Sequence, residues 1–481
     1  ATPTDIITSK SWDKVMFTSY VISLSFYETQ LHRFGLARNN CRDIRIVCDK
    51  DGYQFSLGER QTRGIGNEYQ VTSTLLPKGI FHPKLTWLSS EEIDVVLIGS
   101  GNLTFGGYGK NVECMDIIRS DENPESFAAL ANMLDEWEAR EDLRFAKSEW
   151  IGQWATIARR HADKAGDELP AILPVHSTLE PIGEQLALMA EARGGTKAIR
   201  VLSPFYENNA WGILEFARLL ECKDLTIGLL PGREEKSSFP FDALNGDEIT
   251  VSAAVVEAKE VGESEEGKGP NKDARSLHAK IFEIDLADGK TLLMTGSVNA
   301  THKSLLTSDN VEVASVRFHD EGTSPFSWTP TPTPQSHIPC NFEKSGKQSR
   351  VIVSASINLQ DTLLGEVILN GEAEGTWDAT LQKSDGENEQ FPLEVSASGE
   401  FKHRLGDPDK FRYSTSLQLL MKKTDEVQGK GWVDVEFQLA ANRKNFLSPS
   451  LIEKLLRPIA DEEDEMALLR YLSTEGFRHL E

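Results

Sequence analysis

The chain has 481 residues, a formal net charge of −24 and 26% charged residues, which is typical of a globular protein with more than one domain. The acidic balance argues against a protein that coats nucleic acid over its whole surface, although it leaves room for a local basic site. Five scattered cysteines without a Cys-x-x-Cys pair exclude a disulfide framework and a cysteine zinc site, and no apolar run is long enough to span a bilayer. We therefore expect a soluble protein of the reducing cytoplasm.

The first two thirds of the chain predict helices that alternate with buried strands. Apolar spacing indicates helix at 11–38, strand at 41–49, strand at 94–100 and mainly helix at 124–192. From residue 197 the order strand, turn, helix, strand recurs, and "PFYE" at 204–207 repeats "SFYE" at 25–28. For the Tyr and Glu of both segments we favour packing and capping at helix starts over substrate contact. These patterns predict two similar α/β halves, residues 1–190 and 191–322.

The last third has a different texture. Residues 257–274 are charged and contain glycine, so they indicate a mobile loop, either a lid or a tolerated insertion. Residues 323–345 belong to a Pro- and Thr-rich stretch and predict a linker. Alternating apolar and polar residues over 346–446 predict an all-β domain, β-sandwich-like or a barrel, and 447–481 predict two C-terminal helices.

Two stretches of the chain carry the same polar residues in the same order. Residues 81–113 and 277–312 both contain His-x-Lys, an apolar strand, Gly-Ser-x-Asn and then Asn-x-Glu. One His-x-Lys pair is a common surface feature, whereas the complete set, twice and in order, is specific. The candidate catalytic residues are His82, Lys84, Asn102 and Glu113 in the first copy and His278, Lys280, Asn299 and Glu312 in the second, with Ser100 and Ser297 as support for a bound phosphate.

These residue types suit phosphoryl chemistry. Residues i and i+2 of a strand face the same side, so each His projects together with its Lys. Lys supplies a positive charge for a phosphate, Asn and Ser supply neutral donors, and Glu can hold one ring nitrogen of a His. One His could attack phosphorus while the other protonates the leaving oxygen. No carboxylate cluster for a divalent metal is evident, so we expect no metal and no other cofactor.

The doubled motif resembles the paired HxK…GSxN…NxE motifs of the phospholipase D superfamily, over roughly residues 10–320. The second copy has Asp285 at the spacing of the family's "HKD" motif, whereas the first copy has Ser89 there and Asp94 later. The phrase "HPKLTW…GSGNLTFGGYGKNVE" is most similar to the soluble bacterial branch found in restriction and phage-defence nucleases. The resemblance implies two α/β halves, each a mixed sheet flanked by helices, whose motifs meet at a pseudo-two-fold interface.

The resemblance also implies the roles of the residues. His82 would form a covalent phosphohistidine, and His278 would act as general acid and then as base. Lys84, Lys280, Asn102 and Asn299 would hold the phosphate, and Glu113 and Glu312 would orient the histidines. The Asp of the motif is mainly structural in the family.

The resulting prediction is a metal-independent phosphodiesterase, an endonuclease of a bacterial defence or restriction system with DNA as the favoured substrate. Basic residues between Arg33 and Arg63 suit a polyanion. The acidic net charge favours delivery by a partner such as an ATPase, a helicase or another defence subunit. The alternatives are a phospholipase or transphosphatidylase, which the lack of membrane-binding features disfavours, and a catalytically silent scaffold. One chain carries both motifs, so catalysis does not require dimerisation, and homo-oligomerisation stays open.

Overall fold

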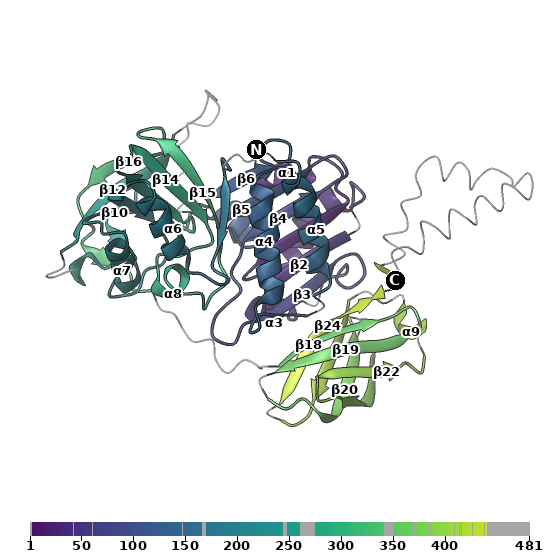
Figure 1. Cartoon of the computed structure of the whole chain (residues 1–481). Coiled ribbons are helices and arrows are strands. Elements are labelled where there is room, and N and C mark those ends of the chain that lie inside the picture. The colour runs from purple at the N-terminus through teal and green to yellow at the C-terminus, as the bar shows by residue number, and fades with distance from the viewer. Residues whose placement is uncertain are drawn as a thin grey trace, which may run out of the picture.

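The computed structural model describes residues 2–439, apart from residues 42, 60, 147, 166–169, 244–247, 260–274, 341–350, 370, 385, 408, 413, 415, 426, 437. The C-terminal helices predicted at 447–481 and most of the loop predicted at 257–274 lie outside these residues. Within the described part the fold is mixed α/β, with two large mixed sheets and a closed seven-stranded barrel (Figure 1). No helix in this part is long and apolar enough to cross a membrane.

The first sheet has seven strands in the order β6-β5-β4-β1-β2-β3-β7. Helices cover both of its faces: α4 and α5 pack on one, and α1 and η1 pack on the other. The strands are β1 Lys14–Ser19, β2 Asp43–Asp49, β3 Gln70–Leu75, β4 Leu85–Ser89, β5 Asp94–Gly99, β6 Met115–Arg119 and β7 Arg144–Phe145. The helices of this part are α1 Pro3–Thr8, α2 Leu24–Phe26, η1 Tyr27–Leu36, α3 Lys50–Ser56, η2 Gly106–Lys110, α4 Ser126–Ala139 and α5 Trp150–Ala162.

The second sheet has eight strands in the order β16-β12-β10-β9-β13-β14-β15-β8. Its main core lies between one face of the sheet and the helices α6, α7 and α8. The strands are β8 Leu173–His176, β9 Thr196–Leu202, β10 Asp224–Leu229, β12 Thr250–Ala258, β13 Ile281–Leu286, β14 Lys290–Gly296, β15 Val313–Asp320 and β16 Phe326–Thr331. The smaller elements are α6 Ile182–Glu191, α7 Trp211–Leu219, η3 Phe241–Ala243, α8 His302–Leu305 and the pair β11 Lys236–Ser237 and β17 Ser336–His337.

The two sheets repeat one topology over seven strands. In the first, β1, β2 and β3 run parallel, β4, β5 and β6 follow as antiparallel neighbours on the other side of β1, and β7 is antiparallel to β3. In the second, β9, β10 and β12 are parallel, β13, β14 and β15 are antiparallel neighbours, and β16 is antiparallel to β12. The internal repeat indicated by the sequence is therefore present in the strand order and strand directions.

The all-β domain predicted for residues 346–446 is a barrel rather than a sandwich. Its strands are β18 Val351–Ile357, β19 Thr362–Leu369, β20 Gly375–Lys383, β21 Asn388–Val395, β22 Glu400–Arg404, β23 Leu417–Lys422 and β24 Gln428–Val435, with α9 Asp409–Arg412 between β22 and β23. The sheet closes because β18 pairs in parallel with β24. Closure leaves no free sheet edge among these strands.

The barrel packs directly against the first sheet (Figure 1). Trp432 of β24 is 4% exposed and lies within the core of the first sheet, where its backbone N–H donates to Tyr53 Oη at 2.8 Å and its Nε1 to Ser56 Oγ at 3.1 Å. The Val435 N–H donates to the Gly66 carbonyl at 2.8 Å. A buried Trp with both donors satisfied is a strong anchor, so we infer that the barrel is held in a fixed position.

Three sequence predictions are corrected here. The helix predicted at 11–38 begins only after β1, because β1 is a central strand buried on both faces and its apolar residues do not alternate. The predicted linker at 323–345 contains β16, which pairs with β12 and tolerates Pro330 as an edge strand. β8, assigned by sequence to residues 1–190, pairs with β15 in the second sheet.

Candidate active site

The two motifs meet where β5 and β6 of the first sheet pack against β14 and β15 of the second. Two isolated parallel bridges join them, Phe81 with Val311 and Val112 with Leu277. In each bridge the residue before a His pairs with the residue before the Glu of the other copy. The eight predicted residues therefore lie at strand ends: His82 and Lys84 before β4, Asn102 after β5, Glu113 before β6, His278 and Lys280 before β13, Asn299 after β14 and Glu312 before β15.

Each histidine is paired with the glutamate of the opposite copy. His82 Nδ1 lies 2.7 Å from Glu312 Oε2, and His278 Nδ1 lies 3.0 Å from Glu113 Oε2. The carboxylate accepts from Nδ1–H, which leaves Nε2 with the lone pair that a nucleophile or base needs. The sequence predicted that these glutamates orient the histidines, but the order of the residues, which is the same in both copies, could not show that the partners are exchanged.

A serine and an asparagine of each motif hydrogen-bond the glutamate of the same copy, and the asparagine lies two residues before that glutamate. Ser100 Oγ donates to Glu113 Oε2 at 2.5 Å, and Ser297 Oγ donates to Glu312 Oε2. Asn111 Nδ2 donates to Glu113 Oε1 at 3.1 Å. Both serine hydroxyls thus position glutamates in this structure, and the predicted direct support of a phosphate by Ser100 and Ser297 stays a prediction.

Burial sets the protonation of the two imidazoles. It lowers the pKa of His82 to about 4, against the opposing effect of the Glu312 charge, and the positive charge of Lys84 lowers it further. Burial also lowers the pKa of His278, while its hydrogen bond to Glu113 opposes this. The His82 side chain is 8% exposed and that of His278 is 17% exposed. At neutral pH His82 is therefore a neutral imidazole.

The glutamates keep their charge despite being buried. Burial alone would raise the pKa of Glu312 and of Glu113, but in both the paired histidine, a serine hydrogen bond and a lysine charge together hold the carboxyl pKa below its usual value. The result is two anionic carboxylates that each face an imidazole. Such an arrangement stabilises positive charge as it develops on the ring.

Two buried lysines share the site. Lys84 Nζ donates to the His82 carbonyl at 3.0 Å, and Lys280 Nζ donates to the His278 carbonyl at 2.6 Å. Burial first, and then the Lys280 charge, push the pKa of Lys84 well below its usual range, and burial lowers the pKa of Lys280 to about 8. Two ammonium groups confined together repel, and an anion placed between them would relieve that repulsion.

The two asparagines stand at the ends of β5 and β14. Asn102 Oδ1 accepts from Ser19 Oγ at 3.3 Å. Asn299 Oδ1 is buried and has no hydrogen-bond partner among the residues that the structure describes. A buried amide without its full set of partners needs an explanation, and a bound ligand or water is the usual one.

The aspartates of the two motifs are structural. Asp285 receives two hydrogen bonds from Arg200, at 2.6 and 2.7 Å, and one from Thr291 at 2.8 Å. Asp94 accepts from Trp87 Nε1 at 3.0 Å and pairs with His161 at 2.5 Å. Asp94 of β5 pairs with Ser89 of β4, in the same way as Thr291 of β14 pairs with Asp285 of β13. The first copy thus places its carboxylate on the opposite strand of the same hairpin.

Sequence reasoning missed two rings that contact the histidines. Tyr20, directly after β1, has its ring centroid 5.5 Å from that of His82. Phe205, shortly after β9, has its centroid 6.3 Å from that of His278. Both rings follow the first strand of a repeat, and the predicted helix at 11–38 concealed the strand before Tyr20. Phe205 lies in the repeated segment at 204–207, where roles were predicted only for the Tyr and Glu.

Other residues that the sequence singled out make structural contacts outside the candidate active site. Glu207 caps α7 and α8 by accepting from the Gly212 and His302 backbone N–H groups, as favoured for a helix start. Glu28 instead accepts from backbone N–H groups of the 63–64 turn. Within the basic cluster, Arg45 hydrogen-bonds Thr72 and Gln70 inside the first sheet. That arginine is therefore used in the fold.

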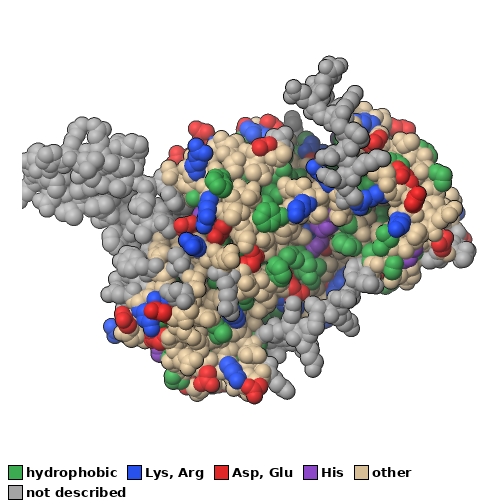
Figure 2. All heavy atoms as spheres, turned by 180° about the vertical axis from the view of Figure 1, so that it is seen from behind, with side chains coloured by type: hydrophobic (Ala, Val, Ile, Leu, Met, Phe, Trp, Pro, Cys, Tyr) green, Lys and Arg blue, Asp and Glu red, His purple; other side chains and the backbone are tan. Residues whose placement is uncertain are grey.

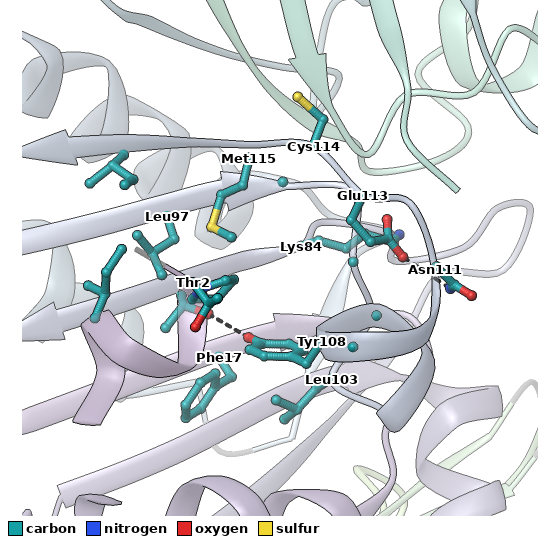
Figure 3. A pocket seen from close by; sticks show the side chains of 18 of the residues that line it. Thr2, Phe17, Lys84, Leu97, Leu103, Tyr108, Asn111, Glu113, Cys114 and Met115 are labelled. Atoms are coloured by element: carbon teal, nitrogen blue, oxygen red, sulfur yellow. Dashed lines mark hydrogen bonds between the residues drawn. The ribbon is translucent and has the colours of Figure 1, made fainter. Parts of the chain in front are cut away.

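A cavity of about 490 Å³ adjoins the site within the first α/β part (Figure 3). It lies over the face of the sheet that carries Thr86 and Leu97, beneath α1 and η2. Lys84 and Glu113 stand on one side of it, and apolar side chains form most of the remaining wall: Phe17, Leu97, Leu103, Tyr108 and Met115. Its size is within the range of small-molecule pockets.

One face of the molecule exposes histidine atoms near its middle, with hydrophobic side chains and Lys or Arg side chains close by (Figure 2). Among the described residues, no three His, Cys, Asp or Glu side chains are grouped as a metal site would require. No protein-family profile matches the chain, and no curated protein matches its sequence. Any assignment of function must therefore rest on the chemistry of this site.

Proposed function

We propose that the chain is a phosphodiesterase of the phospholipase D kind that cleaves nucleic acid through a covalent phosphohistidine. The observation that carries the proposal is the exchange of partners, which sets two glutamate-anchored imidazoles and two buried lysines at one junction. The repeated strand topology supports two phospholipase D-like halves. Transfer of a phosphoryl group requires a nucleophile, a general acid and positive charges that bind the phosphate.

The first step forms a bond between His82 Nε2 and phosphorus. The bond from phosphorus to the leaving oxygen breaks, and His278, which enters this step as the imidazolium with protons on both Nδ1 and Nε2, gives that oxygen its Nε2 proton. A water molecule then attacks the phosphohistidine, loses a proton to His278 and frees His82. The lower pKa of His82 suits a neutral nucleophile, and the more exposed His278 is easier to protonate, so the asymmetry supports this assignment of roles.

The test is cleavage of labelled DNA and RNA in EDTA by the full chain, compared with His278→Ala. We expect cleavage that survives the chelator and is lost in the variant. Acid-labile phosphoryl label on the wild-type protein, absent in His82→Ala, would identify the intermediate. A catalytically silent scaffold would carry no such label, and loss of activity in EDTA would disprove the mechanism.

A phospholipase is the second candidate, because the cavity beside Lys84 and Glu113 has mainly apolar walls. An acyl chain attached to a bound phosphate could occupy it. Turnover of phosphatidylcholine vesicles, lost when Leu97→Glu places a charge in the cavity wall, would favour this candidate. Leu188→Glu, on the exposed surface of α6, is the matched control.

The acidic net charge weakens binding of nucleic acid by the chain alone, so we still predict that a partner delivers the substrate. We expect the isolated chain to cleave plain DNA slowly at physiological salt and an ATPase or helicase partner to raise the rate. Fast cleavage by the pure chain under those conditions would count against it.

A further inference from the structure

An aromatic ring lies against each catalytic histidine, but the two rings differ in exposure. Tyr20 contacts His82 and is partly buried. Phe205 contacts His278 edge-on, with an interplanar angle of 86°, and is 36% exposed. The ring on the side of the general acid is therefore the one that reaches solvent.

The loop between β9 and α7 exposes Phe205 while burying the residue next to it. Tyr206 is 1% exposed and packs on Phe239, so the core at this point is already filled by an aromatic side chain. Phe205 keeps 36% of its surface in contact with solvent, although burying that apolar area would add stability. The exposed part of the ring lies beside His278, on a loop at the candidate active site, where a substrate can contact it.

Phe205 also lies next to a phosphate-binding cation. Lys280 Nζ is 6.0 Å from the centroid of the Phe205 ring. The same loop ends in a second exposed ring, Trp211, which is 47% exposed and stacks on His302 at 3.8 Å. A nucleic acid strand alternates phosphate groups with flat bases, so it can place a phosphate at Lys280 and a base against a neighbouring aromatic ring.

We propose that the substrate is unpaired nucleic acid, and that the base on the leaving-group side of the scissile phosphate stacks on Phe205. This deepens the proposed nuclease function and rests on it. A base within a duplex has both faces covered by its neighbours, so only a single-stranded or extruded base can stack on a side chain. Stacking on a ring tolerates every base, so the contact selects strandedness rather than sequence.

The test is a thermodynamic cycle in which the base of the substrate and the Phe205 ring are removed separately and together. Single-stranded DNA with one natural phosphodiester between methylphosphonate linkages fixes the cleavage position. The nucleotide on the leaving-group side carries a base or is abasic, and kcat/KM is measured for wild type and Phe205→Ala. We expect either single change to lower kcat/KM by roughly 5- to 150-fold, and both together to cost no more than one.

Two further variants separate stacking from folding. Phe205→Trp keeps a ring and should keep the preference for a base, whereas Phe205→Leu keeps apolar bulk and should lose it. Phe34→Ala is the matched control, because Phe34 is 72% exposed on η1, and it should change nothing. Thermal melts of all variants check that each is folded.

The outcomes distinguish this proposal from the function on which it rests. EDTA-resistant cleavage that needs His278 but ignores the base, the ring and strandedness would overturn stacking and leave the phosphodiesterase standing. No cleavage of DNA or RNA, with turnover of phosphatidylcholine vesicles, would overturn both. Equal cleavage of the single strand and its duplex would likewise refute the choice of unpaired substrate.

Discussion

Replacing Glu312 by Gln tests the exchanged pairing most directly. Glu312 is fully buried, and its Oε2 accepts from both His82 Nδ1 and Ser297 Oγ. The other carboxylate oxygen has one long contact, 3.4 Å from Asn310 Nδ2. A Gln oxygen can keep the two short bonds, and its NH₂ group then faces the Asn310 Nδ2 donor, so only the long contact is lost. Glu312→Gln therefore removes the charge and little of the geometry.

The expected size of the effect follows from that hydrogen bond. A bond to a charged group contributes about 1.5–3 kcal/mol and a neutral one about 1 kcal/mol, so attack by His82 loses roughly 1–2 kcal/mol of stabilisation. This corresponds to a rate about 5- to 30-fold lower. The Glu312 charge favours protonation of His82, so removing it lets the pKa of His82 fall further below its already lowered value.

The assay compares two leaving groups. A p-nitrophenyl phosphodiester expels a stable anion that needs no general acid, whereas an alkyl ester does. Glu312→Gln should slow both substrates, because it weakens the nucleophile. Glu113→Gln, which acts on His278, should slow the alkyl ester and leave the p-nitrophenyl ester nearly unchanged.

NMR titration of the two imidazoles provides the independent readout. The pKa of His82 should respond to Glu312→Gln and that of His278 to Glu113→Gln. The reverse response would show that each glutamate serves the histidine of its own copy, and the reasoning from the exchanged pairs would be refuted. Correct NMR responses with reversed leaving-group effects would instead reverse the roles of the histidines.

Three further predictions concern a lysine of the site, the contact with the barrel and the aspartate of the second motif. Burial lowers the pKa of Lys280 to about 8, so its side chain is positively charged below that pH and neutral above it. The value of kcat/KM should therefore fall above about pH 8, and Lys280→Arg should remove that fall. Gly66→Ala should melt lower than Gly232→Ala, because both glycines have positive φ but only at Gly66 would a Cβ meet the barrel, 2.4 Å from Val433 O. Asp285→Asn should cost about 1.5–3 kcal/mol of stability in chemical denaturation and leave kcat nearly unchanged, since its bonds reach only the fold; a large fall in kcat would contradict this.

The sequence predicted the polar residues of the site because their order is repeated. It did not predict their partners, because His82 is 31 residues from Glu113 of its own copy and 230 residues from Glu312 in sequence. The pairing with Glu312 follows from the bridge between Phe81 and Val311, which only the structure shows. Phe205 was missed for a different reason. A ring that binds substrate looks in sequence like any core residue, and only its exposure distinguishes it.

The fold was predictable where local pattern and tertiary role agree. β2 and β5 are short apolar strands, and both lie within the segments predicted from the sequence. β1 was missed because a strand buried on both faces has no alternation that separates it from a helix. β16 was missed because Pro330 and the prolines that flank the strand suggest a linker, whereas an edge strand needs only one side of its backbone for pairing.

The exchange of glutamates between the two copies constrains how this chain can change over generations. In most duplicated proteins one copy is free to accumulate substitutions while the other preserves the activity. Under the proposed mechanism, a substitution at Glu113 weakens the histidine of the second copy, and one at Glu312 weakens that of the first. Neither copy could then lose its glutamate without cost to the other, so selection on either histidine would preserve both halves of the gene.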